Sequence, residues 1–180
     1  MELRRPTLEK KPVLALSGRS NVGKSSLLNR LLGKRVARVS QKPGCTQQVY
    51  LYPAEEGWVW ADLPGYGYAQ VAQATRRAWQ EEVRQFLRRE RPLTCVIIDS
   101  RLPPQQQDQA WVSWLFREEI PVIILANKVD ALSQSALWRQ KKLLPQAFPE
   151  PLYWGWVSAK TGEGVSAFLD WLKGYFAAAR

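Results

Sequence analysis

The chain has 180 residues, of which 46% are hydrophobic and 23% are charged, and these proportions suit one globular domain with a buried core. No apolar run reaches the roughly 18 residues of a membrane span, and two cysteines are too few for a disulfide framework, so we expect a cytoplasmic protein without membrane attachment. The 26 basic and 16 acidic residues give a net charge of +10, which favours a polyanionic partner such as a nucleic acid.

Apolar runs and turn residues alternate along the chain and predict strands alternating with helices. The expected strands lie at residues 12–17, 47–53, 57–63 and 94–100, and at the start of 121–130 and 151–160. The expected helices lie at residues 25–33, 76–91, 105–119, 133–144 and 164–176. This alternation predicts a mostly parallel sheet with helices on both faces, and the short AEEG turn predicts an antiparallel edge strand with Trp58 and Trp60 on one face. We expect one α/β domain over residues 1–180, with 1–11 as an N-terminal extension.

The segment GRSNVGKSS, residues 18–26, lies between the first expected strand and the first expected helix. Its glycines and the following lysine and serine have the spacing of a phosphate-binding P-loop. Glycines let successive backbone N–H groups point at phosphates, and the start of a helix favours anions. Lys24 can reach the β- and γ-phosphates, and the Ser25 hydroxyl can bind Mg²⁺. We expect a nucleoside triphosphate to contact Gly18, Arg19, Ser20, Asn21, Val22, Gly23, Lys24 and Ser25.

The segment ANKVD, which ends the strand expected after residue 121, indicates guanine as the base. The carboxylate of Asp130 can accept hydrogen bonds from the N1–H and the exocyclic amine of guanine, and adenine offers neither. Asn127 can bond to the base edge or tie this loop to the phosphate loop, and the stem of Lys128 can lie along the ring. Backbone amides after the last strand could contact the guanine carbonyl. The expected base site comprises Asn127, Lys128, Val129, Asp130, Val157, Ser158 and Ala159.

Two further segments supply the groups that respond to the γ-phosphate. Asp62, in DLPG, would hold Mg²⁺ through a water, and the N–H of Gly65 would contact the γ-phosphate; Thr46 is the expected second hydroxyl ligand. The expected metal ligands are therefore Ser25, Thr46 and Asp62, and the expected nucleotide contacts of these segments are Gly44, Cys45, Thr46, Gln47, Gln48, Asp62, Leu63, Pro64 and Gly65. The segments around Thr46 and from Leu63 to Thr75 should order with GTP and relax after hydrolysis.

Taken together, GRSNVGKSSLLN, KPGCTQ, DLPGYGYA, IIDSRLPPQQQD and the late NKVD resemble the EngB (YsxC/YihA) family of GTPases, over most of the chain from about Pro12. The resemblance implies a P-loop GTPase fold of the Ras-like three-layer kind with a six-stranded sheet. It also implies a monomer that hydrolyses GTP to GDP as a switch in assembly of the large (50S) ribosomal subunit, with ribosomal RNA as partner and a link to cell division. Cys45 stands where the family usually has a lysine. The alternative is a Ras/Arf-type signalling or trafficking GTPase, although the C-terminal YFAAAR offers no prenylation cysteine.

Hydrolysis should be slow, because Tyr66 stands where Ras-like enzymes carry a water-orienting glutamine. The groups expected to act in the reaction are Lys24, Thr46, Gly65 and Asn21. In related potassium-activated GTPases an asparagine at the position of Asn21 binds a K⁺ ion beside the phosphates. The alternative is that Asn21 only stabilises the loop through backbone hydrogen bonds, and both interpretations stay open.

The helix expected over residues 76–91 is the predicted contact with RNA. At 100° per residue, one side carries Arg77, Arg84, Arg88 and Arg91, and the opposite side carries Trp79, Val83 and Phe86. We expect the apolar side to pack on the sheet and the arginines to face outward toward phosphates; a solvated face is the alternative. Further basic residues that could extend this surface are Lys34, Arg35, Arg38, Lys141 and Lys142.

Overall fold

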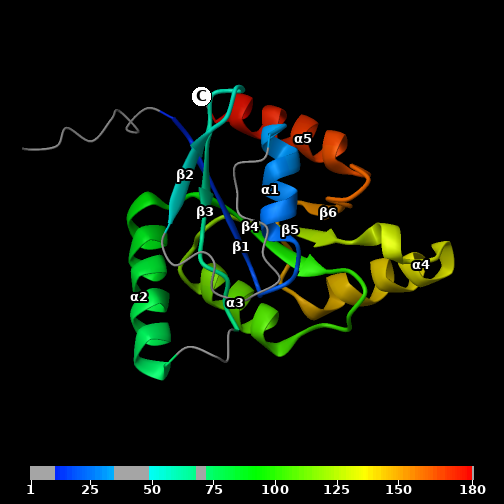
Figure 1. Cartoon of the computed structure of the whole chain (residues 1–180), viewed down its shortest axis with the longest axis horizontal. Helices are drawn as coiled ribbons and strands as arrows, with labels where there is room; N and C mark the ends of the chain where they lie inside the picture. Colours follow the sequence, from blue (N-terminus) through cyan, green and yellow to red (C-terminus); the bar gives the residue numbers. More distant parts are fainter. Residues whose placement is uncertain (1–10, 35–48, 68–71, 180) are drawn as a thin grey trace, which may run out of the picture.

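Figure 1 presents the computed structural model of the chain, which describes residues 11–34, 49–67 and 72–179. Six strands form one sheet in the order β2-β3-β1-β4-β5-β6. Their bounds are β1 Val13–Gly18, β2 Tyr50–Pro53, β3 Val59–Asp62, β4 Leu93–Asp99, β5 Val122–Asn127 and β6 Trp154–Trp156. Only β2 runs antiparallel to its neighbour among these strands, so the predicted mostly parallel sheet with one antiparallel edge strand is confirmed.

Helices cover both faces of this sheet. Their bounds are α1 Lys24–Leu32, α2 Gln73–Glu90, α3 Gln106–Arg117, α4 Gln134–Leu143 and α5 Val165–Ala178, with 3-10 turns at Val129–Ala131 and Leu144–Ala147. Successive residues of β1 point to opposite faces, as they must in a strand. Leu14 and Leu16 join the core under α1 and α5, while Ala15 joins the core under α2 and α3. The layers of the fold therefore follow from this alternation.

The hairpin at the edge of the sheet places two tryptophans in the core. Trp58 and Trp60 are both buried in the cluster with α1 and α5, and their rings meet edge to face at a centroid distance of 6.0 Å. The predicted common face of these two residues is confirmed. The edge strand begins at Tyr50 rather than at residue 47, and residues 47–48 lie outside the described part.

Helix α2 differs from the sequence prediction at its start and on its basic side. It begins at Gln73, three residues earlier than expected, and it ends at Glu90. Val83 and Leu87 are buried against the sheet, and Phe86 packs beside them. The prediction that the arginines of this helix face outward is wrong for Arg84. This residue is half-buried, and its guanidinium lies 5.1 Å from the ring centre of Trp114.

Two more arginines of the predicted stripe are engaged within the molecule. Arg88 lies 5.4 Å from the ring centre of Trp114 and donates hydrogen bonds of 3.1 and 3.0 Å to the Glu118 carboxylate. Arg91 donates to the backbone oxygens of Glu118 and Glu119. The physical reason is the buried indole of Trp114, whose face attracts guanidinium groups from the facing helix. Arg77 is exposed, as expected.

Of the other predicted basic residues, Lys34, Lys141 and Lys142 are exposed, whereas Arg35 and Arg38 lie outside the described residues. In the described part of the chain, no helix combines the length and the apolar character needed to cross a membrane.

Replacing Leu172 of α5 by alanine should lower the free energy of unfolding by about 2–5 kcal/mol, because this side chain is fully buried and its truncation leaves a cavity. Leu152→Ala is the matched control, since the Leu152 side chain is 53% exposed and its truncation should cost about 0.5 kcal/mol or less. Urea unfolding of both variants measures the difference. Equal losses would contradict the assignment of α5 to the core.

Candidate functional site

The phosphate loop connects the end of β1 to the start of α1, where the sequence predicts it. Gly23 has φ +89°, and Asn21 is one of few non-glycine residues with a positive φ, at 69°. Asparagine tolerates this left-handed conformation better than most residues do. A Cβ atom on Gly23 would lie 2.5 Å from Nδ2 of Asn127. The loop therefore needs glycine here both for its backbone angle and for the approach of a neighbouring strand end.

Lys24 and Asp62 come together in the middle of the site. Asp62 ends β3, which lies parallel to β1, and its carboxylate accepts a hydrogen bond from the Lys24 ammonium group. Both side chains are buried. Burial raises the pKa of Asp62, and the charge and hydrogen bond of Lys24 offset part of that rise. A phosphate and a divalent cation would compete for these same two groups.

The described donors around Lys24 fit a magnesium ion. The Ser25 hydroxyl is half-buried in the first turn of α1, and the Asp62 carboxylate lies at the end of a neighbouring strand. Hydroxyl and carboxylate oxygens are the hard donors that Mg²⁺ prefers. The third expected ligand, Thr46, lies outside the described residues together with Gly44, Cys45, Gln47 and Gln48.

Asn127 joins three loops of the site. It is buried at the end of β5, its Nδ2 donates to the backbone oxygen of Val22 over 2.9 Å, and its Oδ1 accepts from the N–H of Ala159 over 3.0 Å. The sequence left two roles open for Asn127, and this geometry corresponds to the tie between the base loop and the phosphate loop. The N–H of Val129 also bonds to the oxygen of Val157.

The loop after β6 orients Asp130. Ser158 Oγ donates a 2.7 Å hydrogen bond to Oδ1 of Asp130, and the N–H of Thr161 donates to Ser158 Oγ over 3.0 Å. Asp130 itself is exposed, so its carboxylate is held in place yet accessible. The N–H of Ser158 bonds to the oxygen of Glu163, and that of Ala159 bonds to Asn127. Contact of either amide with a guanine carbonyl therefore requires these bonds to be shared or exchanged.

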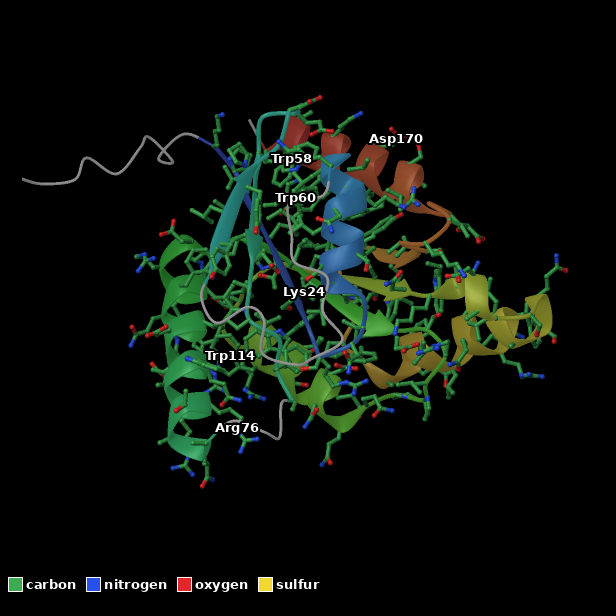
Figure 2. All side chains as sticks on the ribbon, viewed as in Figure 1. Lys24, Trp58, Trp60, Arg76, Trp114 and Asp170 are labelled. Atoms are coloured by element: carbon green, nitrogen blue, oxygen red, sulfur yellow. The ribbon has the colours of Figure 1, made fainter. Side chains whose placement is uncertain are left out.

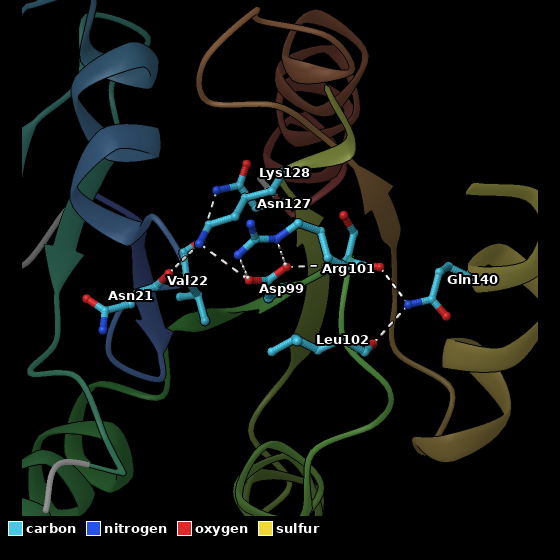
Figure 3. A network of polar contacts seen from close by, with 9 residues as sticks. Asn21, Val22, Asp99, Arg101, Leu102, Asn127, Lys128 and Gln140 are labelled. Carbon is cyan, nitrogen blue, oxygen red and sulfur yellow. Dashed lines mark hydrogen bonds and ion pairs between the residues drawn. The ribbon is translucent and has the colours of Figure 1, made fainter. Parts of the chain in front are cut away.

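A polar network under the base loop was missed by the sequence analysis (Figure 3). Lys128 Nζ donates to the backbone oxygen of Asn21 over 2.6 Å and lies 3.3 Å from Oδ2 of Asp99. Arg101 holds both oxygens of Asp99 at 3.0 and 2.8 Å. Burial alone would raise the pKa of Asp99, but the hydrogen bonds of Arg101 and the charge of Lys128 bring it below its ordinary value. The signal available in the sequence was an aspartate ending the apolar strand β4.

Tyr66 is bound to the phosphate loop and to α3. Its N–H donates to the oxygen of Gly18 over 3.2 Å, and its own carbonyl accepts from the N–H of Ser20 over 3.3 Å. Its hydroxyl donates over 2.8 Å to Oδ1 of Asp108, which also accepts from Nε of Arg19 at 3.2 Å. Burial and the neighbouring Asp108 raise the pKa of the Tyr66 phenol, so it stays protonated and donates. Asp108 was not singled out from the sequence.

The structure thus brings the described site residues of four segments to the carboxyl ends of the parallel strands. Of the DLPG residues, Asp62 and Leu63 are buried, Pro64 is half-buried and Gly65 is exposed. Ligands of open α/β sheets bind at this edge.

Comparisons with known proteins agree with this geometry. Residues 13–128 match a family model described as "50S ribosome-binding GTPase". A protein of Cytophaga hutchinsonii, "Probable GTP-binding protein EngB", is 39% identical over 171 residues, which cover 90% of this chain and 85% of that protein. The protein of the same description from Thermotoga petrophila is 38% identical over 163 residues, covering 87% of this chain and 83% of the relative.

Solved structures give the same fold. The crystal structure of a probable GTP-binding protein engB has a TM-score of 0.72 at 23% identity, with 88% of this chain and 95% of that chain covered. A tyrosine-to-alanine variant of Aquifex aeolicus Era bound to GDP·AlF4⁻ has a TM-score of 0.77 at 25% identity, covering 91% of this chain and 56% of the Era chain.

Replacing Gly23 by alanine should abolish measurable GTP binding, because the added methyl group displaces Asn127 as well as straining the loop. Gly33→Ala is the matched control, since Gly33 also has a positive φ of +66° but a Cβ atom added to it would meet no atom within 4 Å. The control should lose about 1–2 kcal/mol of stability and keep its GTP affinity. Titration calorimetry and thermal unfolding of both variants measure the two effects. Retained GTP affinity in Gly23→Ala would contradict the packing argument.

Proposed function

The chain belongs to the EngB family of GTP-binding proteins and is a GTPase, and from this premise we propose that it acts as a GTP-dependent switch in assembly of the large ribosomal subunit. The single observation that carries the nucleotide part is the buried bridge of Asn127. Asn127 bonds to Val22 of the phosphate loop and to Ala159 of the loop after β6, and it thereby fixes the distance between these two loops. A site with two such halves selects a ligand that has both phosphates and a base.

In the proposed complex the phosphates lie on the N–H groups at the start of α1, with Lys24 turned from Asp62 toward the β- and γ-phosphates. Asp130 reads the two hydrogen-bond donors of guanine, and the Ser158 hydroxyl keeps its carboxylate in position. Mg²⁺ would be held by Ser25, Thr46 and Asp62 and would supply neutralisation of the phosphate charge. The Gly65 N–H is the proposed contact to the γ-phosphate.

Hydrolysis by the isolated chain is proposed to be slow because of how Tyr66 is held. Its hydroxyl is committed to Asp108, and a phenol cannot both donate and accept as a carboxamide does. The chain therefore supplies little of its own to orient the attacking water, and it depends on its P-loop lysine and on a partner or ion for rate.

The ribosomal part of the proposal is supported by the description of the matching family model and by the charge of the chain. That model is described as a 50S ribosome-binding GTPase, and a net charge of +10 favours a phosphate-rich partner such as ribosomal RNA. The protein would then work as a monomer in the cytoplasm. No feature of the described site favours the Ras/Arf-type alternative.

Loaded with a non-hydrolysable GTP analogue, the protein should co-sediment with large ribosomal subunits or their precursors, and loaded with GDP it should do so at least about fivefold less. Raising the salt concentration from about 50 to about 200 mM should weaken the interaction strongly, since counterion release drives phosphate contacts. Anionic liposomes serve as the control partner. Pelleting with liposomes but not with ribosomal particles, or equal pelleting in both nucleotide states, would reject the ribosomal role.

The role of Asn21 can be decided by one substitution. Its carboxamide is exposed and points away from Lys128, whereas its backbone oxygen accepts the Lys128 bond (Figure 3). Asn21→Gly keeps the left-handed backbone and that bond but removes the carboxamide. If the carboxamide binds K⁺, GTP turnover of the parent protein will be faster in KCl than in NaCl at equal ionic strength, and the variant will lose the difference. Equal turnover in both salts would assign Asn21 to loop structure alone.

A further inference from the structure

We propose that the groove between α2 and α3 binds an unpaired nucleotide of an RNA strand, with the base against tryptophan rings and the phosphate on arginines. This inference deepens the ribosomal role proposed above and rests on it. The groove begins beside Gly65 and Tyr66, where the chain leaves the end of β3, and it runs between the facing sides of the two helices. Figure 2 labels Arg76 of α2 and Trp114 of α3, which both line it.

The groove has the size of a ligand site. Its main part encloses about 380 Å³, and a narrower apolar extension of about 40 Å³ reaches toward Pro64 and Val83. Sites for small ligands usually enclose roughly 300–1,000 Å³. A single nucleotide fits this range, whereas a duplex does not enter a groove of this size. A-form RNA also keeps its paired bases stacked inside the helix, so only an unpaired base could reach the tryptophans.

Two tryptophans give the groove flat apolar walls. Trp79 belongs to α2 and Trp111 to α3, and both are half-buried. Trp111 is fixed in place, because its indole N–H donates to Ser17 Oγ over 3.0 Å and its ring stacks on Trp114 at a centroid distance of 5.2 Å. A half-buried aromatic side chain that is held in place is a common platform for an unstacked base. Trp79, which the sequence analysis expected against the sheet, instead lines the narrow apolar extension of the groove.

The charges of the groove match an anion. Arg76, Arg77 and Arg84 line its main part, and no aspartate or glutamate is among the described lining residues. Arg84 also carries a buried Nε atom without a hydrogen-bond partner, so one donor in the wall is unmet. A buried donor without a hydrogen-bond partner destabilises the protein. A ligand acceptor that bonds to this donor, directly or after a movement of the side chain, would remove that free-energy cost. A base with its flanking phosphate supplies the aromatic face and the negative charge together.

The position of the groove links its occupancy to the nucleotide state. Tyr66 and Gly67 belong to its lining, and Tyr66 is hydrogen-bonded to Gly18 and Ser20 of the phosphate loop. A movement of Tyr66 with the γ-phosphate would reshape one end of the groove. RNA binding and GTP binding would then favour or oppose each other by the same factor, because such coupling is reciprocal.

The test uses the full chain and a fluorescein-labelled single-stranded RNA of about ten nucleotides, with fluorescence anisotropy as the readout. Trp111→Leu should weaken binding about tenfold, since Trp111 lines both parts of the groove and one base loses its stacking partner. Trp138→Leu is the control, because Trp138 is a 60% exposed tryptophan on α4, away from the groove, and its replacement should change the affinity less than about twofold. The duplex form of the same RNA should bind markedly less tightly.

A second pair of variants keeps the test independent of folding. Arg77→Gln, at an exposed position of the groove, should lower the slope of log affinity against log salt by about one. Arg89→Gln makes the same charge change on the same helix, but Arg89 is paired with Glu90 outside the groove, and its replacement should leave that slope unchanged. Equal effects within either pair, or duplex binding as tight as single-strand binding, would overturn the proposal.

The outcomes separate this inference from the ribosomal role. If the parent protein co-sediments with ribosomal particles but binds no single-stranded RNA, the groove proposal fails and the ribosomal role stands. If it binds single-stranded RNA through the groove but no ribosomal particle in either nucleotide state, the ribosomal role fails instead. Binding of anionic phospholipid vesicles that depends on Trp111, in place of RNA, would also overturn the groove proposal.

Discussion

The buried amide of Asn127 is the contact on which the rest of the site depends. One side chain, at the end of β5, holds the oxygen of Val22 and the N–H of Ala159. Three loops that are far apart in the sequence are thereby fixed relative to one another, and the rigid sheet behind them sets the distance between their binding groups. Because the side chain is buried, its two hydrogen bonds are not weakened by competing water.

The second organising feature is the way Tyr66 connects the phosphate loop to α3. Its backbone bonds to Gly18 and Ser20, and its hydroxyl meets Arg19 at the same oxygen of Asp108. Tyr66 is thus attached both to the phosphate loop and to α3. A movement of Tyr66 would therefore be passed directly to α3, which lines the groove. This route needs no long chain of coupled residues, because every contact in it is direct.

Local patterns predicted most of the fold and the place of the candidate site. The P-loop spacing after β1, DLPG at the end of β3 and NKVD at the end of β5 each depend on neighbours in the sequence, so their positions could be inferred before the structure was known. Helix boundaries were less exact, as with α2, which starts at Gln73. Alternation also placed Trp58 and Trp60 on one face correctly.

What the sequence could not supply were contacts between distant segments. Helical periodicity places Arg84 and Arg88 on one side of α2, but it does not reveal that Trp114 of α3 lies opposite them. Asp99 and Asp108 likewise gain their roles only when folding brings Lys128 and Tyr66 to them. The stack of Trp111 on Trp114, with Tyr66 at a centroid distance of 5.6 Å from Trp111, has an optical consequence. Closely stacked indoles held in a fixed asymmetric arrangement give near-ultraviolet circular dichroism, so Tyr66 lies against a chromophore that belongs to the fold itself.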